Sequence, residues 1–249
     1  MHLIPFDLHE AAILLDVDGT VLDLAPRPAD VCVPEPLRRT LERLSDKTGG
    51  ALALVSGRTL ADLDRIFAPL LLPSIGGHGA EMRVNGHDGQ LHPTVPLTDA
   101  LRRRFAAIAL DKSGLIVEDK GYSLALHYRL APRHAPALRE AVAAICAELP
   151  PDTVEVLPGK ALIEVKQVGF NKGTAVRELM SHPPFHGRRP IFIGDDTTDE
   201  AAFAVVPEFD GIAFSVGRKV PGALSRFKAP RDVRGWLEHI SEAGGNGGS

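Results

Sequence analysis

Residues 11–20 read AAILLDVDGT, and this stretch decides how the rest of the chain is interpreted. The run from Ala11 to Leu15 is apolar throughout and stops at Asp16, where an acidic turn begins. A short apolar run that is bounded by turn residues predicts a strand buried on both faces of a sheet. We therefore expect Asp16 and Asp18 to stand at the end of a buried strand, where open α/β sheets bind their ligands.

The sequence on either side of this stretch alternates between helical and strand patterns. Helical spacing follows in residues 34–44, and a second apolar run, Ala51 to Val55, ends at Ser56. The alternation resumes at Asn171 and continues to a last helix near Trp236. Strands that alternate with helices predict a doubly wound parallel sheet, which is an α/β, Rossmann-like core.

The pattern changes between residues 97 and 168. This segment predicts, in order, a helix, two strands, a second helix and two further strands, the last pair turning at Pro158-Gly159. Such an order is typical of an α+β layer and not of a parallel sheet. We therefore assign residues 1–96 and 169–249 to the core and residues 97–168 to an inserted α+β cap domain.

Composition and charge narrow the class of protein. The 249-residue chain is 44% hydrophobic and 24% charged, which is ordinary for a globular protein. Its formal net charge of −4 offers no electrostatic footprint for nucleic acid. The opening residues MHLIPFDLHE lack signal-peptide features, no stretch reaches the length of a membrane span, and the two cysteines lack metal-ligand spacing. We expect a cytoplasmic monomer with neither a membrane nor a nucleic-acid partner.

Polar clusters follow three of the predicted core strands, and together they indicate a metal site. They are Asp16 with Asp18, Ser56, and the run Gly194 to Glu200, which reads GDDTTDE. If these strands are neighbours, several carboxylates converge, and like charges at close range oppose ionisation. A divalent cation removes that cost, and a ligand set made only of oxygens favours Mg²⁺ over Zn²⁺.

Each cluster by itself has an ordinary structural explanation. Asp-x-Asp-Gly is a common turn composition, and Asp199 and Glu200 favour the start of a helix. The functional interpretation rests on the combination, because all the clusters occur in order and each follows an apolar strand.

These clusters resemble the motifs of the haloacid dehalogenase-like phosphohydrolases. The matching stretches are Asp16-Val17-Asp18-Gly19-Thr20, Ser56 after Leu54-Val55, Lys172 in Asn171-Lys172-Gly173, and Gly194-Asp195-Asp196-Thr197-Thr198-Asp199. The insert lies between the second and third motifs, where this superfamily places its larger type of cap.

Further stretches narrow the resemblance to the trehalose-phosphate phosphatases and extend it over about Leu14 to Gly217. They are Gly77-His78-Gly79-Ala80-Glu81, Glu118-Asp119-Lys120, His127-Tyr128-Arg129, Gly159-Lys160 with Glu164, and the run ending at Glu200. One departure is Val165-Lys166-Gln167-Val168, where we expect an Arg-Pro pair after the strand.

The resemblance implies that Asp16 attacks phosphorus and forms an aspartyl-phosphate, which water then hydrolyses. It implies that Asp18 protonates the leaving sugar oxygen and later takes a proton from the attacking water. Lys172 and the Ser56 hydroxyl would bind phosphoryl oxygens, where fixed charges stabilise the transferring group.

The resemblance also implies a Mg²⁺ ion and a set of residues that bind substrate. The implied metal ligands are Asp16, Asp18 and Asp195, with Asp196 and Asp199 as alternative or outer ligands. The implied substrate-binding residues are Gly19 and Thr20, through their backbone amides, Gly57, Arg58, and, in the cap, Glu118, Lys120 and Glu164. His78 and His127 are interpreted as structural, and the roles of Tyr128 and Arg129 stay open.

The predicted function is hydrolysis of trehalose 6-phosphate to trehalose and phosphate, a step of trehalose biosynthesis. One alternative is another capped sugar-phosphate phosphatase, acting on sucrose phosphate or mannosyl-phosphoglycerate, in which only the cap contacts differ. The other is a non-catalytic module that senses phosphosugars, or the regulatory half of a complex with a trehalose-phosphate synthase. The presence of Asp16, Asp18, Lys172 and Asp195 argues against a sensor, because a sensor needs no nucleophile.

Overall fold

The computed structural model describes residues 7–25, 30–85, 96–159 and 161–243. The chain divides into two compact units, one formed by Met1–His92 with Asn171–Ser249 and the other by Pro93–Phe170. The boundaries expected from the sequence, at residues 97 and 168, fall a few residues inside the smaller unit.

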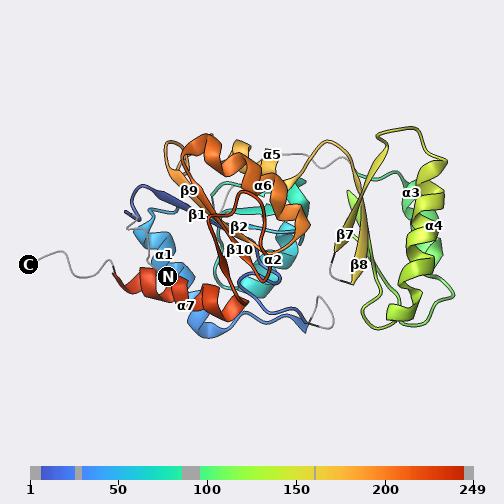
Figure 1. Ribbon diagram of the computed structural model, residues 1–249, viewed down its shortest axis with the longest axis horizontal. Helices are drawn as coiled ribbons and strands as arrows, with labels where there is room; N and C mark the ends of the chain where they lie inside the picture. The colour runs from blue at the N-terminus through green and yellow to red at the C-terminus, as the bar shows by residue number, and fades with distance from the viewer. Residues whose placement is uncertain (1–6, 26–29, 86–95, 160, 244–249) are drawn as a thin grey trace, which may run out of the picture. The chain divides into compact units, whose positions relative to one another are not determined.

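A seven-stranded sheet forms the larger unit, with its strands in the order β11-β10-β9-β1-β2-β3-β4 (Figure 1). The strands are β1 (Ala11–Leu15), β2 (Leu52–Val55), β3 (Ser74–Gly76), β4 (Glu81–Arg83), β9 (Arg189–Gly194), β10 (Ile212–Val216) and β11 (Ser225–Phe227). Neighbouring strands are parallel except for β3 and β4, which are antiparallel. The predicted parallel α/β core is therefore confirmed, although the sequence patterns did not indicate β11.

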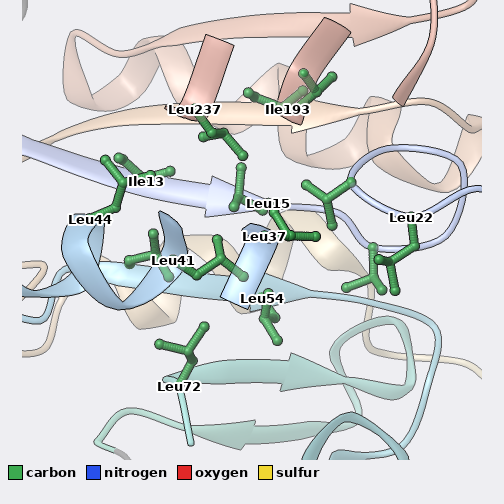
Figure 2. Packing of buried hydrophobic residues seen from close by; sticks show 14 of the residues in the cluster. Ile13, Leu15, Leu22, Leu37, Leu41, Leu44, Leu54, Leu72, Ile193 and Leu237 are labelled. Carbon is green, nitrogen blue, oxygen red and sulfur yellow. The ribbon is translucent and has the colours of Figure 1, made fainter. Parts of the chain in front are cut away.

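Helices cover both faces of this sheet (Figure 1). Successive residues of a strand point to opposite faces, so β1 contributes to two cores. Ile13 and Leu15 pack with leucines of α1 (Glu35–Lys47) and α7 (Pro230–Ala243), and with α2 (Leu60–Phe67), as Figure 2 shows for the first two helices. Ala12 and Leu14 pack instead with α5 (Lys172–Leu179) and α6 (Glu200–Val205). The alternating burial explains why β1 is apolar at every position.

The smaller unit is an antiparallel sheet in the order β5-β6-β8-β7, with two helices packed on it. Its elements are α3 (Asp99–Ala106), β5 (Ile116–Asp119), β6 (Ser123–His127), α4 (Ala135–Ala147), β7 (Val154–Gly159) and β8 (Leu162–Gln167). Leu124, Leu126 and Val165 pack against the helices. Strand alternation then places Ser123 and Glu164 on the opposite face. Its elements follow the order predicted for the inserted α+β segment, and this unit is called the cap below.

Short 3₁₀ helices complete the described structure: Gly77–Gly79, Ala107–Ala109, Pro132–His134, Thr197–Asp199 and Val206–Phe209. Among the residues described, no helix is both long enough and apolar enough to span a membrane.

The predicted turn at Pro158-Gly159 is wrong. Both residues belong to β7, and they pair with Ile163 and Leu162 of β8. A proline removes one backbone donor, but β7 is an edge strand, where an outward-facing donor has no neighbouring strand to bond. The chain therefore turns later, at Ala161, which adopts a φ of 65°. Lys160, which belongs to the family resemblance, lies outside the described residues.

Candidate active site

The register of the central strands brings the separate sequence motifs to one edge of the sheet. Leu15 of β1 pairs with Ile193 of β9 and with Leu54 of β2. The Asp16 N–H donates to the Ile193 carbonyl at 2.9 Å, so the chain is still held in the sheet at Asp16. The residues that follow β9 and β2, including Asp195 and Ser56, leave the sheet at this same carboxyl edge.

Three buried carboxylates occupy this edge. Asp16, Asp195 and Asp199 are 4%, 2% and 0% exposed, and one carboxylate oxygen of each lies within 4.8 Å of the other two. Burial and the charge of Asp199 raise the pKa of Asp16, against the opposing effect of Lys172. The cluster therefore needs positive charge close by if its members are to stay ionised at neutral pH.

Lys172 supplies part of that charge. Its Nζ donates to Asp16 Oδ1 at 2.7 Å and to Asp199 Oδ1 at 2.6 Å, and the residue is 2% exposed. Burial alone would lower the pKa of Lys172, but the charges of Asp16 and Asp199 raise it above its usual range. Lys172 therefore stays an ammonium ion and neutralises one of the buried carboxylates.

The sequence around Lys172 explains how a lysine comes to begin a helix here. The Asn171 side chain accepts the Thr174 N–H at 2.9 Å and so caps α5. At Gly173, an added Cβ would lie 2.3 Å from the carbonyl oxygen of Ala201 in α6. Glycine therefore lets α5 approach α6 closely, and this approach carries Lys172 to the acidic edge.

Asp199 and Asp196 differ in position, although both were expected to be alternative or outer metal ligands. Asp199 Oδ2 accepts the backbone N–H groups of Asp195 and Asp196, each at 2.9 Å, while its Oδ1 contacts Lys172. Asp196 instead caps the turn that follows, with its Oδ1 accepting the Thr197 N–H at 2.7 Å. Asp199 thus belongs to the buried cluster and orients the loop that carries Asp195, whereas Asp196 serves the helix start.

The cluster fits a hard divalent cation. All of its ligand atoms are carboxylate oxygens, which Mg²⁺ prefers. Gly19 has a φ of +87°, and a Cβ there would lie 2.2 Å from Asp195 Oδ2. A glycine at this position therefore allows the Asp195 carboxylate to lie directly against the turn that follows Asp16.

The hydrogen bonds of the Gly19 and Thr20 backbone amides differ from those we expected. The Gly19 N–H donates to the Leu22 carbonyl at 2.8 Å, and the Thr20 N–H donates to the Val17 carbonyl at 3.3 Å. They stabilise the turn and do not point a donor into the site. The Thr20 hydroxyl has a different role, since it donates to Asp16 Oδ2 at 2.7 Å, while Lys172 holds the other oxygen of that carboxylate.

The second motif lies beside the first. Ser56 is 1% exposed, and its Oγ accepts the Arg58 N–H at 3.1 Å. Gly57 lies against the ring of His78, because a Cβ there would be 2.3 Å from His78 Nε2. The Arg58 guanidinium donates to Asp18 through Nε at 2.6 Å and through Nη2 at 2.7 Å. The family resemblance implied that Arg58 binds the substrate, and the contact between Arg58 and Asp18 was not predicted.

The polar residues predicted in the cap form two linked pairs on the face of its sheet opposite the helices. Lys120 Nζ lies 3.2 Å from Glu164 Oε1, which also accepts the Ser123 hydroxyl at 2.5 Å. His127 Nε2 lies 2.8 Å from Glu118 Oε2. The side chain of Glu164 is 3% exposed and that of Glu118 is 29% exposed, so Glu118 is the more accessible acceptor.

The sequence interpretation missed the polar role of Ser123 in the cap, and it gave His127 a structural role without naming its partner. Burial alone would raise the pKa of Glu118, but the hydrogen bond with His127 and the charge of Lys120 hold it below its ordinary value. His127 therefore orients Glu118, and Ser123 orients Glu164. Strand alternation was the signal that could have found them, because both lie on the same sheet face as Glu164. Tyr128 belongs to the buried core of the cap, where Arg139 donates to its hydroxyl at 3.2 Å.

Comparison with known proteins gives a consistent set of relatives. The family model described as trehalose-phosphatase matches residues 14–229. A probable trehalose-phosphate phosphatase of Sinorhizobium fredii is 41% identical, over 94% of this chain and 89% of the relative. The trehalose-6-phosphate phosphatase of Escherichia coli is 38% identical, over 93% of this chain and 87% of the relative.

Solved structures show the same similarity at the level of the fold. The C-terminal domain of the Candida albicans trehalose-6-phosphate phosphatase aligns with a TM-score of 0.81 at 25% identity, covering 94% of this chain and 93% of that domain. A haloalkanoate-superfamily phosphatase from Bacteroides thetaiotaomicron, 15% identical, aligns with a TM-score of 0.61 over 96% of this chain and 98% of that one, and shares the fold. The family match includes the acidic edge of the core and the polar face of the cap, and the chain belongs to the trehalose-phosphatase family.

Proposed function

We propose that this chain hydrolyses trehalose 6-phosphate to trehalose and phosphate through an aspartyl-phosphate formed on Asp16. The observation that carries the proposal is the position of Asp16 at the end of the central strand, buried with Lys172, Asp195 and Asp199. The family of the chain supports the choice of substrate, because its relatives are named for this activity.

The geometry suits Asp16 to nucleophilic attack. Lys172 and Thr20 each hold one of its carboxylate oxygens, so the carboxylate is oriented before substrate binds. A carboxylate is anionic without the help of a general base, and its attack on phosphorus releases the sugar oxygen. Lys172 and the Ser56 hydroxyl would bind phosphoryl oxygens and stabilise the charge that spreads over them.

Asp18 would carry the proton that the reaction moves. It would donate the proton to the departing sugar oxygen and then accept one from the water that hydrolyses the aspartyl-phosphate. Its side chain is 30% exposed, in contrast to the buried Asp16, so a leaving group and a water molecule can reach it.

We propose Mg²⁺ as the cofactor, held by the Asp16 carboxylate, the Asp195 carboxylate and the Asp18 backbone carbonyl. When bound, it would neutralise the buried carboxylates and the phosphoryl oxygens, so that the two anions can approach each other. Asp199 would act as an outer residue, because both of its oxygens already contact Lys172 and the backbone.

The cap would supply specificity for the sugar. Glu118, Lys120 and Glu164 gather charged donors and acceptors on one face of the cap sheet, and sugar hydroxyls bond well to such groups. We propose that residues 97–168 form this cap and that residues 1–96 and 169–249 supply the chemistry. A cytoplasmic location, a monomeric state and a synthase partner stay predictions.

The decisive experiment measures phosphate release from trehalose 6-phosphate, sucrose 6-phosphate, mannosyl-phosphoglycerate and glucose 6-phosphate, each with Mg²⁺ and with excess chelator. We expect the highest kcat/KM for trehalose 6-phosphate, and loss of activity on chelation that added Mg²⁺ restores. A preference for another disaccharide or glyceryl ester would move the assignment to a different sugar phosphatase. No release from any of the esters would favour a regulatory module.

A further inference from the structure

Asp18 and Arg58 form a paired contact that the proposed reaction does not by itself explain. The Arg58 guanidinium donates through Nε to Asp18 Oδ2 and through Nη2 to Asp18 Oδ1. Two parallel charge-assisted hydrogen bonds fix the plane of a carboxylate as well as its position. The contact joins the turn after β1 to the turn after β2.

Arg58 is itself held rigidly by the turn between β2 and α2. Its N–H donates to Ser56 Oγ at 3.1 Å, and its carbonyl accepts the Gly77 N–H at 2.7 Å. Its side chain is 7% exposed, with Nη1 3.9 Å from Asp62 in the first turn of α2. Because its backbone is hydrogen-bonded and its side chain is buried, Arg58 loses less entropy on holding Asp18 than an exposed arginine would.

A fixed Asp18 matters because a proton donor must meet the leaving oxygen at hydrogen-bond distance. Misplacing a reacting group by about 1 Å can cost on the order of 10²-fold in rate. Asp16 is held by Lys172 and Thr20, and the corresponding support for Asp18 comes from Arg58.

We propose that Arg58 is a positioning residue for Asp18 and not a ligand of the substrate phosphate. Two of the three guanidinium nitrogens already serve Asp18, and the third faces Asp62. This inference rests on the proposed function, since it assumes that Asp18 is the acid of a phosphatase. It replaces the substrate-binding role that the sequence suggested for Arg58.

The test compares two small aryl esters that differ in their need for a proton. Phenyl phosphate has a poor leaving group that needs protonation, whereas the nitrophenolate of 4-nitrophenyl phosphate leaves without it. The quantity measured is kcat/KM, which reports the steps through formation of the aspartyl-phosphate and excludes its hydrolysis by water. Neither ester carries a sugar, so the result does not depend on the specificity of the cap.

The variant Arg58→Met should lower kcat/KM for phenyl phosphate by about 10²-fold, as expected for losing an acid catalyst. It should change kcat/KM for 4-nitrophenyl phosphate by less than about threefold, with KM nearly unchanged. Arg58→Lys keeps the charge but only one hydrogen bond, and should give an intermediate loss for phenyl phosphate alone. Arg39→Met, an exposed arginine of α1 that pairs with Glu35, is the matched control and should affect neither ester.

A double-mutant cycle completes the test. If Arg58 acts through Asp18, Asp18→Asn should show the same difference between the esters, and adding Arg58→Met to it should cost little more. Equal losses for both esters with a raised KM would instead make Arg58 a phosphate ligand and overturn the proposal. Additive losses in the double variant would also overturn it. A wild-type protein that releases phosphate neither from these esters nor from trehalose 6-phosphate would reject the phosphatase function itself, which is a separate outcome.

Discussion

Lys172 in the core and Lys166 in the cap are both buried, at 2% and 1% exposure, but they contact different kinds of partner. Lys172 Nζ lies between the two buried carboxylates of Asp16 and Asp199. Lys166 Nζ donates to the Phe170 carbonyl, lies 4.1 Å from the centre of the Phe170 ring, and is 2.7 Å from Glu155, whose side chain is 46% exposed.

The difference shows that burial of a charge does not by itself identify a chemical site. The Lys172 ammonium ion lies beside more buried carboxylates than it can neutralise, which is the arrangement of a candidate functional site. Lys166 is instead satisfied by a backbone carbonyl, an aromatic ring and a carboxylate that faces solvent, which is a structural arrangement. It stands where we expected an Arg-Pro pair, and it holds the last residues of the cap segment together.

The largest effect should come from Asp16→Asn in the core. The amide is a poor nucleophile, so kcat should fall by about 10³-fold or more for trehalose 6-phosphate and for 4-nitrophenyl phosphate alike. The fold should persist, because the substitution is nearly isosteric. Phosphate release and circular dichroism check the two statements, and near-normal turnover with saturating Mg²⁺ would remove Asp16 from the nucleophile role.

Lys172→Met sharpens the comparison between the two lysines. We expect a loss of activity of at least about 10²-fold, since the variant lacks the fixed positive charge that would bind the phosphoryl oxygens. Without a divalent ion, Asp16 and Asp199 are left unpaired in the core, which costs about 3–5 kcal/mol of folding stability. Thermal unfolding in chelator and in Mg²⁺ measures this cost.

The control for Lys172→Met is the wild type under the same two conditions. Mg²⁺ should raise the melting temperature of Lys172→Met more than that of the wild type, because the ion replaces the missing positive charge. An equal response of the two proteins to Mg²⁺ would contradict a metal site at this cluster.

Glu118→Ala tests whether the cap recognises the sugar. A buried polar group left unpaired costs about 1–3 kcal/mol, so kcat/KM for trehalose 6-phosphate should fall by about 5- to 150-fold. Hydrolysis of 4-nitrophenyl phosphate, which needs only the core, should hardly change. Glu164→Ala should show the same selectivity together with a lower melting temperature, because Glu164 is buried with Lys120.

The neighbouring Asp119→Ala is the matched control for Glu118→Ala. Asp119 is on the same strand, but its side chain is 44% exposed and contacts Arg102. We expect kcat/KM for the disaccharide to stay within about twofold, since an exposed ion pair contributes little. If Glu118→Ala lowers both activities in equal proportion, Glu118 does not bind the sugar.

Lys166→Met should have the smallest effect on activity. Its partners lie within the cap and outside the reacting groups, so kcat for 4-nitrophenyl phosphate should stay within about twofold. The free energy of unfolding should fall by about 1–3 kcal/mol, because the Phe170 carbonyl loses its donor. A loss of activity comparable to that of Lys172→Met would refute the structural interpretation of Lys166.

Features that depend on neighbouring residues could be predicted from the amino-acid sequence alone. The apolar run before Asp16, the helix–strand alternation and the inserted α+β segment predicted the fold class, because burial on two faces and helical spacing leave local patterns. The rule that ligands bind at strand ends also predicted that Asp16, Ser56 and Asp195 share one edge of the sheet.

The contacts that these side chains make at that edge follow from the folded chain and not from the motifs. Asp199, and not Asp196, joins the buried cluster, Arg58 holds Asp18, and the Gly19 amide closes its own turn. Such contacts depend on strand order, register and rotamer, and these are determined by interactions between residues far apart in the chain. A motif predicts which chemical groups reach a site, whereas packing determines the partner that each group finds.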